Sequence, residues 1–316
     1  MKEKIIFDVD TGEDDAIAIA LAAGLREEID IVALIATAGN VSLDKTLENT
    51  LNMAEVLALD VPVYKGSSGP LLRDRAEASD FHGITGLDGP SFPKRMKQEC
   101  CGNGLPFALD YVLSHPGEVS FVSVGPLTDL AVLIKSDPGF AKSLKRIVIM
   151  GGSMGRGNAT DAAEFNIYAD PEAAEIVFNC KAEVVMMGLD VTLKLILDEG
   201  ILSKVKSLPD SAYKRLFLSQ MSFYIPANLK HNHDYPAMHD PCAIAYLVCP
   251  EAFRFERRPI HVETKGSLAY GATIAGEISD DADVLVGVDV DKEAFWSLFF
   301  RAFENLEQYM DSDLYF

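Results

Sequence analysis

The chain has 316 residues, a length that fits one large α/β domain or two small ones. Its 48% hydrophobic and 24% charged residues are typical of a soluble globular protein with a sizeable core. The 48 acidic residues outnumber the 28 basic ones, and the net charge of −20 argues against a nucleic-acid or anionic-membrane partner, since both attract basic surfaces.

The five cysteines include the adjacent pair Cys100 and Cys101 but no CxxC spacing, which indicates reduced thiols and disfavours a disulfide framework or a zinc site. The chain enters a strand at once, without the basic leader and apolar core of a signal peptide. No apolar stretch reaches membrane-spanning length. We therefore expect a cytoplasmic protein.

The opening stretch, residues 4–16, is an apolar strand that ends abruptly in acid. Its acidic residues are Asp8, Asp10, Glu13, Asp14 and Asp15. An acid in the first turn of the following helix can simply cap it, and this role would be sufficient to explain Asp14. It does not explain Asp8 and Asp10, which lie at the carboxyl end of the predicted strand, where open α/β sheets bind their ligands. Like charges this close repel by about 1 kcal/mol per pair even in water. We therefore predict a hard divalent cation, calcium or magnesium, among these carboxylates.

Strands and helices alternate through the first 190 residues. Strands are expected at 30–37, 61–64, 119–124, 145–150 and 184–187, and helices at 42–59, at 104–114, after 125–128 and from Pro171. Residues 66–103 lack a steady period, and so long an irregular stretch in a compact domain is usually functional. The alternation with near-continuous apolar strands predicts an α/β fold with a mainly parallel open sheet and helices on both faces.

The last third of the chain is less regular. We expect helices over 198–225, from Pro241 and over 291–309, strands near 258–264 and 284–289, and a loop over 226–241 that carries His231, His233 and His239. No linker, composition shift or internal repeat marks a boundary. Residues 1–316 are therefore predicted to form a single domain.

Further polar groups recur where the predicted strands stop. Asn40 follows the second strand, and a glycine-rich run at 151–157 follows the fifth. Glu164 and Asn166 alternate, so in an extended segment both would point the same way. His239 and Asp240 precede Pro241 at a helix start, where Asp240 equally fits a cap and a lone His fits a structural or surface role.

Together these stretches resemble the inosine–uridine nucleoside hydrolase family, in family order and over nearly the whole chain. The resemblance rests on Asp8-Val9-Asp10-Thr11-Gly12-Glu13-Asp14-Asp15-Ala16, Ala38-Gly39-Asn40, His82-Gly83, Gly86-Leu87-Asp88-Gly89, Gly125-Pro126-Leu127-Thr128, Met150-Gly151-Gly152, Gly157-Asn158, Ala163-Glu164-Phe165-Asn166 and His239-Asp240-Pro241-Cys242. Asp129 stands where many members have Asn, a departure that we expect to matter little.

The resemblance implies a Rossmann-like nucleoside hydrolase fold and calcium-dependent hydrolysis of the N-glycosidic bond of ribonucleosides, releasing base and ribose. The implied Ca²⁺ ligands are Asp10, Asp15, Asp240 and the carbonyl oxygen of Val124. Asp10 would also take the proton of the attacking water as general base. The implied ribose-binding residues are Asp14, Asn40, Met150, Asn158, Glu164 and Asn166.

His82 and His239 would lie toward the base, where one of them protonates or polarises the leaving group. Purine or pyrimidine preference stays open, because the base pocket should draw on the irregular segments 76–84 and 222–239. Five residues there either reach the base or coat a solvated loop: Tyr224, Asn228, His231, His233 and Tyr235. We also expect a homodimer or homotetramer that acts on small-molecule ribonucleosides in nucleoside catabolism or salvage.

Two other functions fit parts of the pattern. In a Mg²⁺-dependent aspartyl phosphotransferase, Asp8 would be the nucleophile and Asp10 the proton donor, but Glu164, Asn166 and the His239–Asp240 pair would have no role. A ribose- or nucleoside-binding protein could keep the calcium cleft without turnover. The intact general base Asp10 beside a complete ligand set argues against that alternative.

Overall fold

The computed structural model describes residues 2–76, 78–231 and 234–316, and within them a nine-stranded sheet organises the fold. The strand order is β4 (Cys100–Asn103), β3 (Val63–Lys65), β2 (Ile29–Ala36), β1 (Glu3–Val9), β5 (Val119–Ser123), β6 (Arg146–Met150), β7 (Val184–Met187), β11 (Val284–Val290) and β8 (Phe253–Arg257). Neighbours run parallel except β8, which is antiparallel to β11. The predicted mainly parallel sheet is confirmed. A separate antiparallel hairpin consists of β9 (Ile260–Val262) and β10 (Thr273–Ala275).

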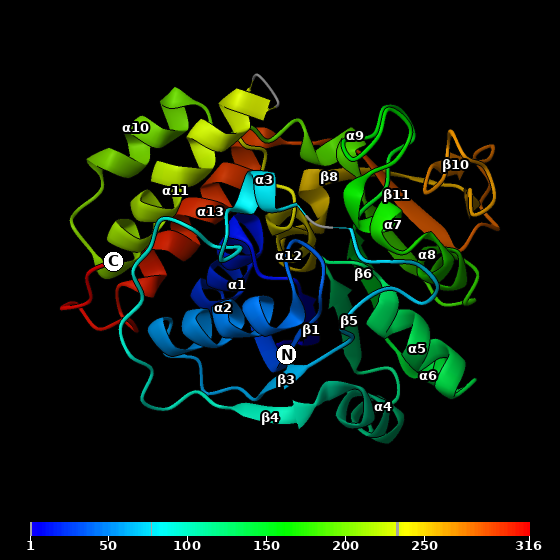
Figure 1. Cartoon of the computed structure of the whole chain (residues 1–316), viewed down its shortest axis with the longest axis horizontal. Helices are drawn as coiled ribbons and strands as arrows, with labels where there is room; N and C mark the ends of the chain where they lie inside the picture. The colour runs from blue at the N-terminus through cyan, green and yellow to red at the C-terminus, as the bar shows by residue number, and fades with distance from the viewer. Residues whose placement is uncertain (1, 77, 232–233) are drawn as a thin grey trace.

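Helices cover both faces of the sheet, as Figure 1 shows. One face carries α1 (Glu13–Gly24), α2 (Leu43–Val56), α11 (Ala212–His231), α12 (Pro241–Val248) and α13 (Lys292–Leu306), and the other carries α4 (Gly104–Ser114), α5 (Thr128–Ser136), α6 (Phe140–Ser143) and α8 (Pro171–Phe178). Successive side chains of β1 point to opposite faces of the sheet. Ile5 and Phe7 therefore belong to the hydrophobic core on the first face, and Ile6 belongs to the core on the second face. The shorter elements are α3 (Ser79–His82), α7 (Phe165–Ala169), α9 (Leu189–Thr192), α10 (Glu199–Ser207) and η1 (Pro250–Ala252).

Helix α1 is buried along its whole length. Its apolar residues run all round the helix, which is typical of a helix with protein on every side. It packs against α12 and against α13, the orange-red helix beside it in Figure 1. Gly24 permits the approach to α13, since a Cβ at this position would lie 2.3 Å from the carbonyl oxygen of Ala302. The first turn of α1 is therefore held firmly at the carboxyl end of β1.

The order of strands reverses between β1 and β5. Strands β2 to β4 lie on one side of β1, and the chain then returns to place β5 to β7 on the other side. Open α/β sheets bind their ligands at such a point, outside the carboxyl ends of the strands. Asp10 follows β1 and Val124 follows β5, so both lie at this crevice.

Three predicted elements differ from the structure. The loop predicted over 226–241 begins later, because α11 continues through Pro226 to His231; burial of Tyr224 and Asn228 outweighs the cost of a proline inside a helix. The strand predicted near 258–264 is broken at Pro259, which lacks the N–H that a ladder requires. The irregular segment 66–103 contains the short elements α3 and β4.

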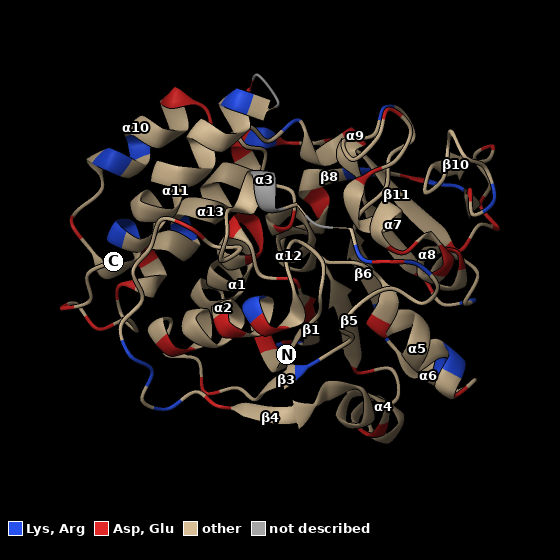
Figure 2. Ribbon diagram, in the orientation of Figure 1, with Lys and Arg blue, Asp and Glu red and all other residues tan. Residues whose placement is uncertain are grey.

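The segment around Glu164 is helical and not extended, because α7 begins at Phe165 and Glu164 is its N-cap. The closing helix was predicted over 291–309 and is observed as α13. Within the described ranges no helix combines the length and apolarity needed to cross a membrane. Figure 2 shows Lys and Arg spread over peripheral helices and loops among the acidic residues.

Candidate active site

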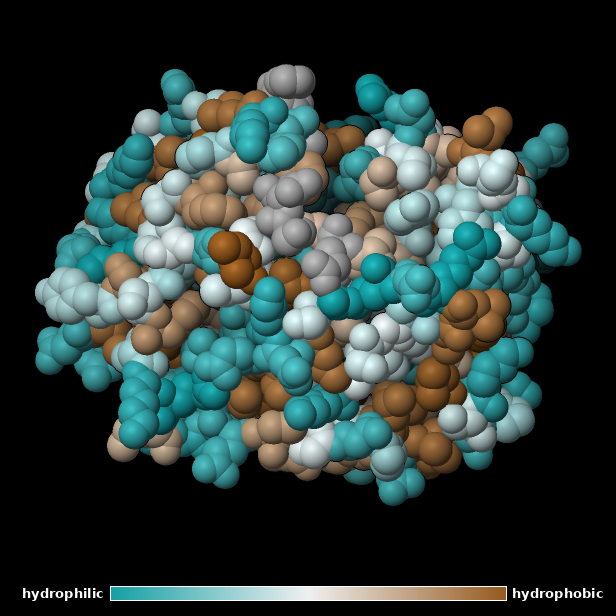
Figure 3. Space-filling model, viewed as in Figure 1, coloured by the Kyte–Doolittle hydropathy of each residue, from teal (hydrophilic) through white to brown (hydrophobic). Residues whose placement is uncertain are grey.

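A cavity of about 270 Å³ lies at the crevice between β1 and β5, and Figure 3 shows the surface hollowed near α3. It collects almost all of the residues singled out in the sequence: Asp10, Asp14, Asn40, His82, Val124, Met150, Asn158, Glu164, Asn166, His239 and Asp240. Asp15, a predicted calcium ligand, is fully buried and does not line the cavity. Segments more than 200 residues apart in the sequence therefore meet in one site.

The side chain of Asp10 is held by the loop that follows β2. The backbone N–H of Asn40 donates to Oδ2 of Asp10 at 2.7 Å, and Nδ2 of Asn40 donates to the Asp10 carbonyl at 3.2 Å. A Cβ at Gly39 would lie 2.1 Å from the same Oδ2, so the glycine is needed for this close approach. Burial and the charge of Asp15 raise the pKa of Asp10 well above its ordinary value. Asp10 is therefore a fixed carboxyl group that favours a proton.

Asp15 ties the start of α1 to the end of β1. Its Oδ1 accepts from the backbone N–H of Asp10 at 3.0 Å, and its Oδ2 accepts from the N–H of Gly12 at 3.0 Å. Nδ2 of Asn40 also lies 3.3 Å from Oδ2. This carboxylate thus caps the helix and at the same time orders the backbone of the adjacent site residue.

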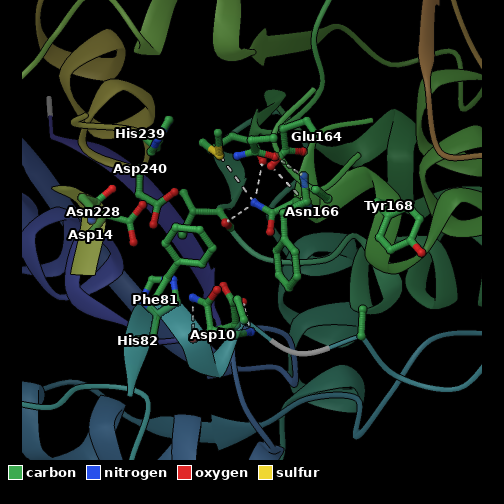
Figure 4. A pocket seen from close by; sticks show the side chains of 18 of the residues that line it. Asp10, Asp14, Phe81, His82, Glu164, Asn166, Tyr168, Asn228, His239 and Asp240 are labelled. Atoms are coloured by element: carbon green, nitrogen blue, oxygen red, sulfur yellow. Dashed lines mark hydrogen bonds between the residues drawn. The ribbon is translucent and has the colours of Figure 1, made fainter. Parts of the chain in front are cut away.

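Asp14, Asp15 and Asp240 form a compact group of buried carboxylates. One oxygen from each lies within 4.8 Å of the others, and Figure 4 shows the carboxyl groups of Asp14 and Asp240 next to each other. Asp240 occupies the N-cap position of α12 but makes no capping hydrogen bond with its side chain, so the capping alternative does not explain it. Burial and the neighbouring acids raise the pKa of Asp14 to about 7 and that of Asp240 well above its ordinary value. Burial therefore disfavours the charged form of all three carboxyl groups.

Glu164 and Asn166 lie across the cavity from these acids (Figure 4). The Glu164 carboxylate accepts backbone N–H groups of Gly152, Asn166 and Ile167 at 2.9–3.1 Å. Nδ2 of Asn166 donates to the carbonyl oxygens of Val124 at 2.6 Å and Met150 at 3.1 Å. Glu164 and Asn166 meet in one site because Glu164 is the N-cap of α7 and Asn166 lies in the first turn of that helix. They do not lie on one side of an extended segment, as their alternate spacing in the sequence suggested.

The two histidines of the cavity have different environments. Nδ1 of His82 lies 2.6 Å from Oε2 of the buried Glu13. Burial alone would lower the pKa of His82, but the hydrogen bond and charge of Glu13, with the charges of Asp14 and Asp15, raise it to about 9. Nδ1 of His239 pairs with the Thr192 hydroxyl at 2.8 Å. Burial and the His82 charge lower the pKa of His239 to about 4.

The remaining lining shows where a base could lie. Both irregular segments contribute, with Phe81 and His82 from 76–84 and Tyr224, Asn228 and His239 from 222–239. Three of the five residues that the sequence offered for base contact are not among the described residues of the lining. His231 is exposed and does not line the cavity, and the Tyr235 hydroxyl donates a hydrogen bond to Oε1 of Glu199 at 2.9 Å. His233 lies outside the described residues. Sequence reasoning missed three aromatic residues of the lining, Phe81 in α3 and Phe165 and Tyr168 in α7, because an aromatic residue in a sequence more often marks packing than a ligand site.

Asp8 does not belong to the cavity lining, although its sequence position suggested a place in the acid cluster. Its Oδ2 accepts a hydrogen bond from the Ser123 hydroxyl at 2.7 Å. Burial, and secondly the charge of the neighbouring Asp129, raise the pKa of Asp8 well above its ordinary value. Both side chains are fully buried. Asp8 is therefore not placed to act as the nucleophile of an aspartyl phosphotransferase.

A family model described as inosine-uridine preferring nucleoside hydrolase matches residues 5–297. The chain belongs to the nucleoside hydrolase family. Its relative in Escherichia coli (strain K12), the pyrimidine-specific ribonucleoside hydrolase RihB, is 36% identical over 302 residues, covering 94% of this chain and 96% of RihB. The solved purine-preferring ribonucleoside hydrolase from Gardnerella vaginalis is 30% identical, with a TM-score of 0.89 and coverage of 96% of this chain and 99% of that one. The plant nucleoside hydrolase PpNRh1 is also 30% identical, with a TM-score of 0.87 and coverage of 97% and 99%.

This nucleoside hydrolase is therefore a ribonucleoside hydrolase, an enzyme of nucleoside catabolism that cleaves N-ribosyl bonds. Its similarity to structures from the same family confirms the predicted fold. The membership also removes both alternatives considered from the sequence, the phosphotransferase and the binding protein without turnover.

Proposed function

We propose that this ribonucleoside hydrolase depends on a calcium ion held by the buried acids, with Asp10 as general base, and that pyrimidine ribonucleosides are its preferred substrates. The observation that carries the proposal is the group of Asp14, Asp15 and Asp240 carboxylates within 4.8 Å of one another, beside Asp10 in one cavity. Buried like charges of this kind are costly unless a cation compensates them.

The chemistry of the donor set fits calcium. Carboxylate and carbonyl oxygens suit a hard divalent cation, and no His or Cys belongs to the compact group. Asp10, Asp15, Asp240 and the Val124 carbonyl would hold the ion. Val124 already accepts from Asn166, but a carbonyl oxygen has a second lone pair. When bound, the ion would supply Lewis-acid activation of a water molecule and compensation of the acidic charge.

Asp10 is suited to accept a proton during the reaction. The Asn40 N–H holds the carboxyl group in place, and a cation bound beside it would keep this carboxylate ionised and able to accept a proton. The attacking water would give its proton to Asp10 as its oxygen bonds to C1′ of the ribose. The bond from C1′ to the base breaks, and its electron pair leaves with the base.

The opposite wall would stabilise the sugar. Cleavage develops positive charge on the ribose ring, and the nearby Glu164 carboxylate favours that charge over the neutral substrate. Asn166 uses Nδ2 for Val124 and Met150, so its Oδ1 is the atom that can accept from a ribose hydroxyl. Asp14, Asn40 and Asn158 would provide further polar contacts to the sugar. His82 and His239 would contact the base, and His82 is the more basic of the two.

The preference for pyrimidines is supported by the 36% identity to RihB over nearly the full length of both chains, compared with 30% for the purine-preferring enzyme. The test is an assay of free ribose released from uridine, cytidine, inosine and adenosine side by side, with calcium and after chelation. We expect kcat/KM to be highest for uridine or cytidine. Faster hydrolysis of inosine and adenosine would contradict the preference, and undiminished activity after verified calcium removal would contradict the metal.

A further inference from the structure

Glu13 makes a buried contact that the proposed reaction does not use. It is the first residue of α1 and is fully buried, although it carries a carboxyl group. Its Oε2 lies 2.6 Å from Nδ1 of His82, while its Oε1 has no hydrogen-bond partner among the described residues. A buried acid is expensive unless it is paired, so the contact with His82 is the interaction that accounts for its position.

The His82 ring is also confined by its other neighbours. A Cβ at Gly12 would lie 2.5 Å from Nδ1, so the ring rests directly against the turn between β1 and α1. The ring of Tyr224 stacks on it, with centroids 5.9 Å apart and an angle of 26° between the planes. His82 closes the four-residue helix α3, which is too short to fix a side chain by itself. Its orientation therefore depends on Gly12, Tyr224 and Glu13.

We propose that Glu13 is a positioning residue for the leaving base: by engaging Nδ1 of His82, it reserves Nε2 of the same ring for the base. This inference rests on the proposed function. The arrangement follows a general pattern in which a buried carboxylate orients an imidazole through one nitrogen and leaves the other for chemistry. His82 lines the cavity, and Nε2 is the only polar atom of its ring that Glu13 does not occupy.

The step that this geometry serves is transfer of a proton to the base. As the C1′–N bond breaks, its electron pair goes to the base, and the proton on Nε2 of His82 passes to an oxygen or nitrogen atom of the base. The ring retains the proton on Nδ1, which stays hydrogen-bonded to Glu13. Solvent returns a proton to Nε2 after the neutral base has left.

The test compares two leaving groups in variants of Glu13. E13L removes the acceptor for Nδ1, whereas E13Q retains an acceptor oxygen without the charge. For E13L we expect kcat on uridine to fall by about 10–100-fold, the range seen when a partner that orients a metal-ligating histidine is removed. KM should change much less, and E13Q should recover part of the loss. With p-nitrophenyl riboside, whose leaving group needs no proton, both variants should retain near wild-type turnover.

A double-mutant cycle separates this role from an effect on the adjacent acids of α1. If Glu13 acts through His82, then E13L should have no further effect in an H82A background. D129N is the matched control, since it also exchanges a buried carboxyl group near β1 but leaves His82 untouched, and it should leave both activities unchanged. Equal losses of E13L on both substrates, or a double variant slower than H82A by the full factor of E13L, would overturn the inference.

A measurement on the wild-type enzyme covers the case in which E13L does not fold. In protein labelled with ¹⁵N-histidine, the Nδ1 proton of His82, assigned with H82Q, should resonate strongly downfield because of its hydrogen bond to Glu13. Its absence would refute the positioning contact. A wild-type enzyme that releases ribose from no nucleoside would instead refute the proposed function. An active enzyme whose E13L variant behaves as wild type refutes the inference alone.

Discussion

Replacement of Asp129 by Asn should stabilise the protein, because Asp129 and Asp8 are two buried carboxyl groups that face each other. Oδ1 of Asp129 accepts from the backbone N–H of Ser67 at 2.7 Å, and Oδ2 of Asp8 accepts from Ser123. The other oxygen of each acid has no hydrogen-bond partner among the described residues. A shared proton can satisfy both, but folding must then take up that proton. The Asn side chain would supply an N–H donor to Asp8 permanently and keep its oxygen for Ser67.

The expected gain follows from the cost of a buried polar atom left without a partner, about 1–3 kcal/mol. At about 2 °C for each kcal/mol in a large chain, D129N should raise Tm by roughly 2–6 °C at neutral pH. Burial raises the pKa of Asp129 in the folded state. The stabilisation from its bound proton is therefore complete below the unfolded-state pKa, about 4, and is lost as the pH rises through the folded-state pKa. The gain from D129N should thus be small near pH 4 and increase toward alkaline pH.

Thermal unfolding of both proteins across this pH range is the assay. D170N is a suitable control, because Asp170 is equally buried but accepts hydrogen bonds from Ala173, Thr128 and Leu71, so the amide should bring no gain. A D129N variant that is less stable than the wild type at neutral pH, or a gain that does not depend on pH, would refute the shared-proton explanation.

Three further predictions concern the proposed mechanism. Chelation of calcium should lower both Tm and turnover, since an ion bound only by the folded state stabilises it; calorimetry with and without chelator measures this, and unchanged melting would contradict it. D10N should reduce kcat by about 10²–10⁴-fold in steady-state assays, and retention of a tenth of the activity would remove Asp10 from the role of base. 2′-Deoxyuridine should be hydrolysed up to about 10⁴-fold more slowly than uridine, because Glu164 and Asn166 belong to a site built for hydroxyl groups; comparable rates would refute this sugar recognition.

The sequence predicted the site better than it predicted the local structure around it. Asp10, Asp14 and Asp15 follow a strand directly, and a parallel sheet brings such strand ends together, so their convergence with Asn40 could be foreseen. Glu164 reached the cavity for a different reason from the predicted one. Its carboxylate caps α7, and a cap of this kind cannot be distinguished from an extended segment without knowing where the helix begins.

The parts that were not foreseen depend on contacts between distant segments. Glu13 looked like one more acid of the first turn, and its partner His82 lies 69 residues away in an irregular segment. Asp8 alternates with Asp10 in the sequence, yet Ser123 and Asp129 hold it outside the cavity. The continuation of α11 beyond Pro226 also depends on burial of Tyr224 and Asn228, which local propensity does not encode.

The burial of α1 against α13 has a consequence for the way in which the protein is made. Gly24 of α1 and Asn305 of α13, separated by 281 residues, are joined by a hydrogen bond of 2.9 Å. A ribosome releases α1 long before α13, so the apolar surface of α1 that packs on α13 stays uncovered until α13 has emerged. Contacts of such long range slow folding and expose growing chains to aggregation. Because Asp14 and Asp15 lie on α1, the nascent enzyme should acquire its catalytic pocket only after α13 has been synthesised.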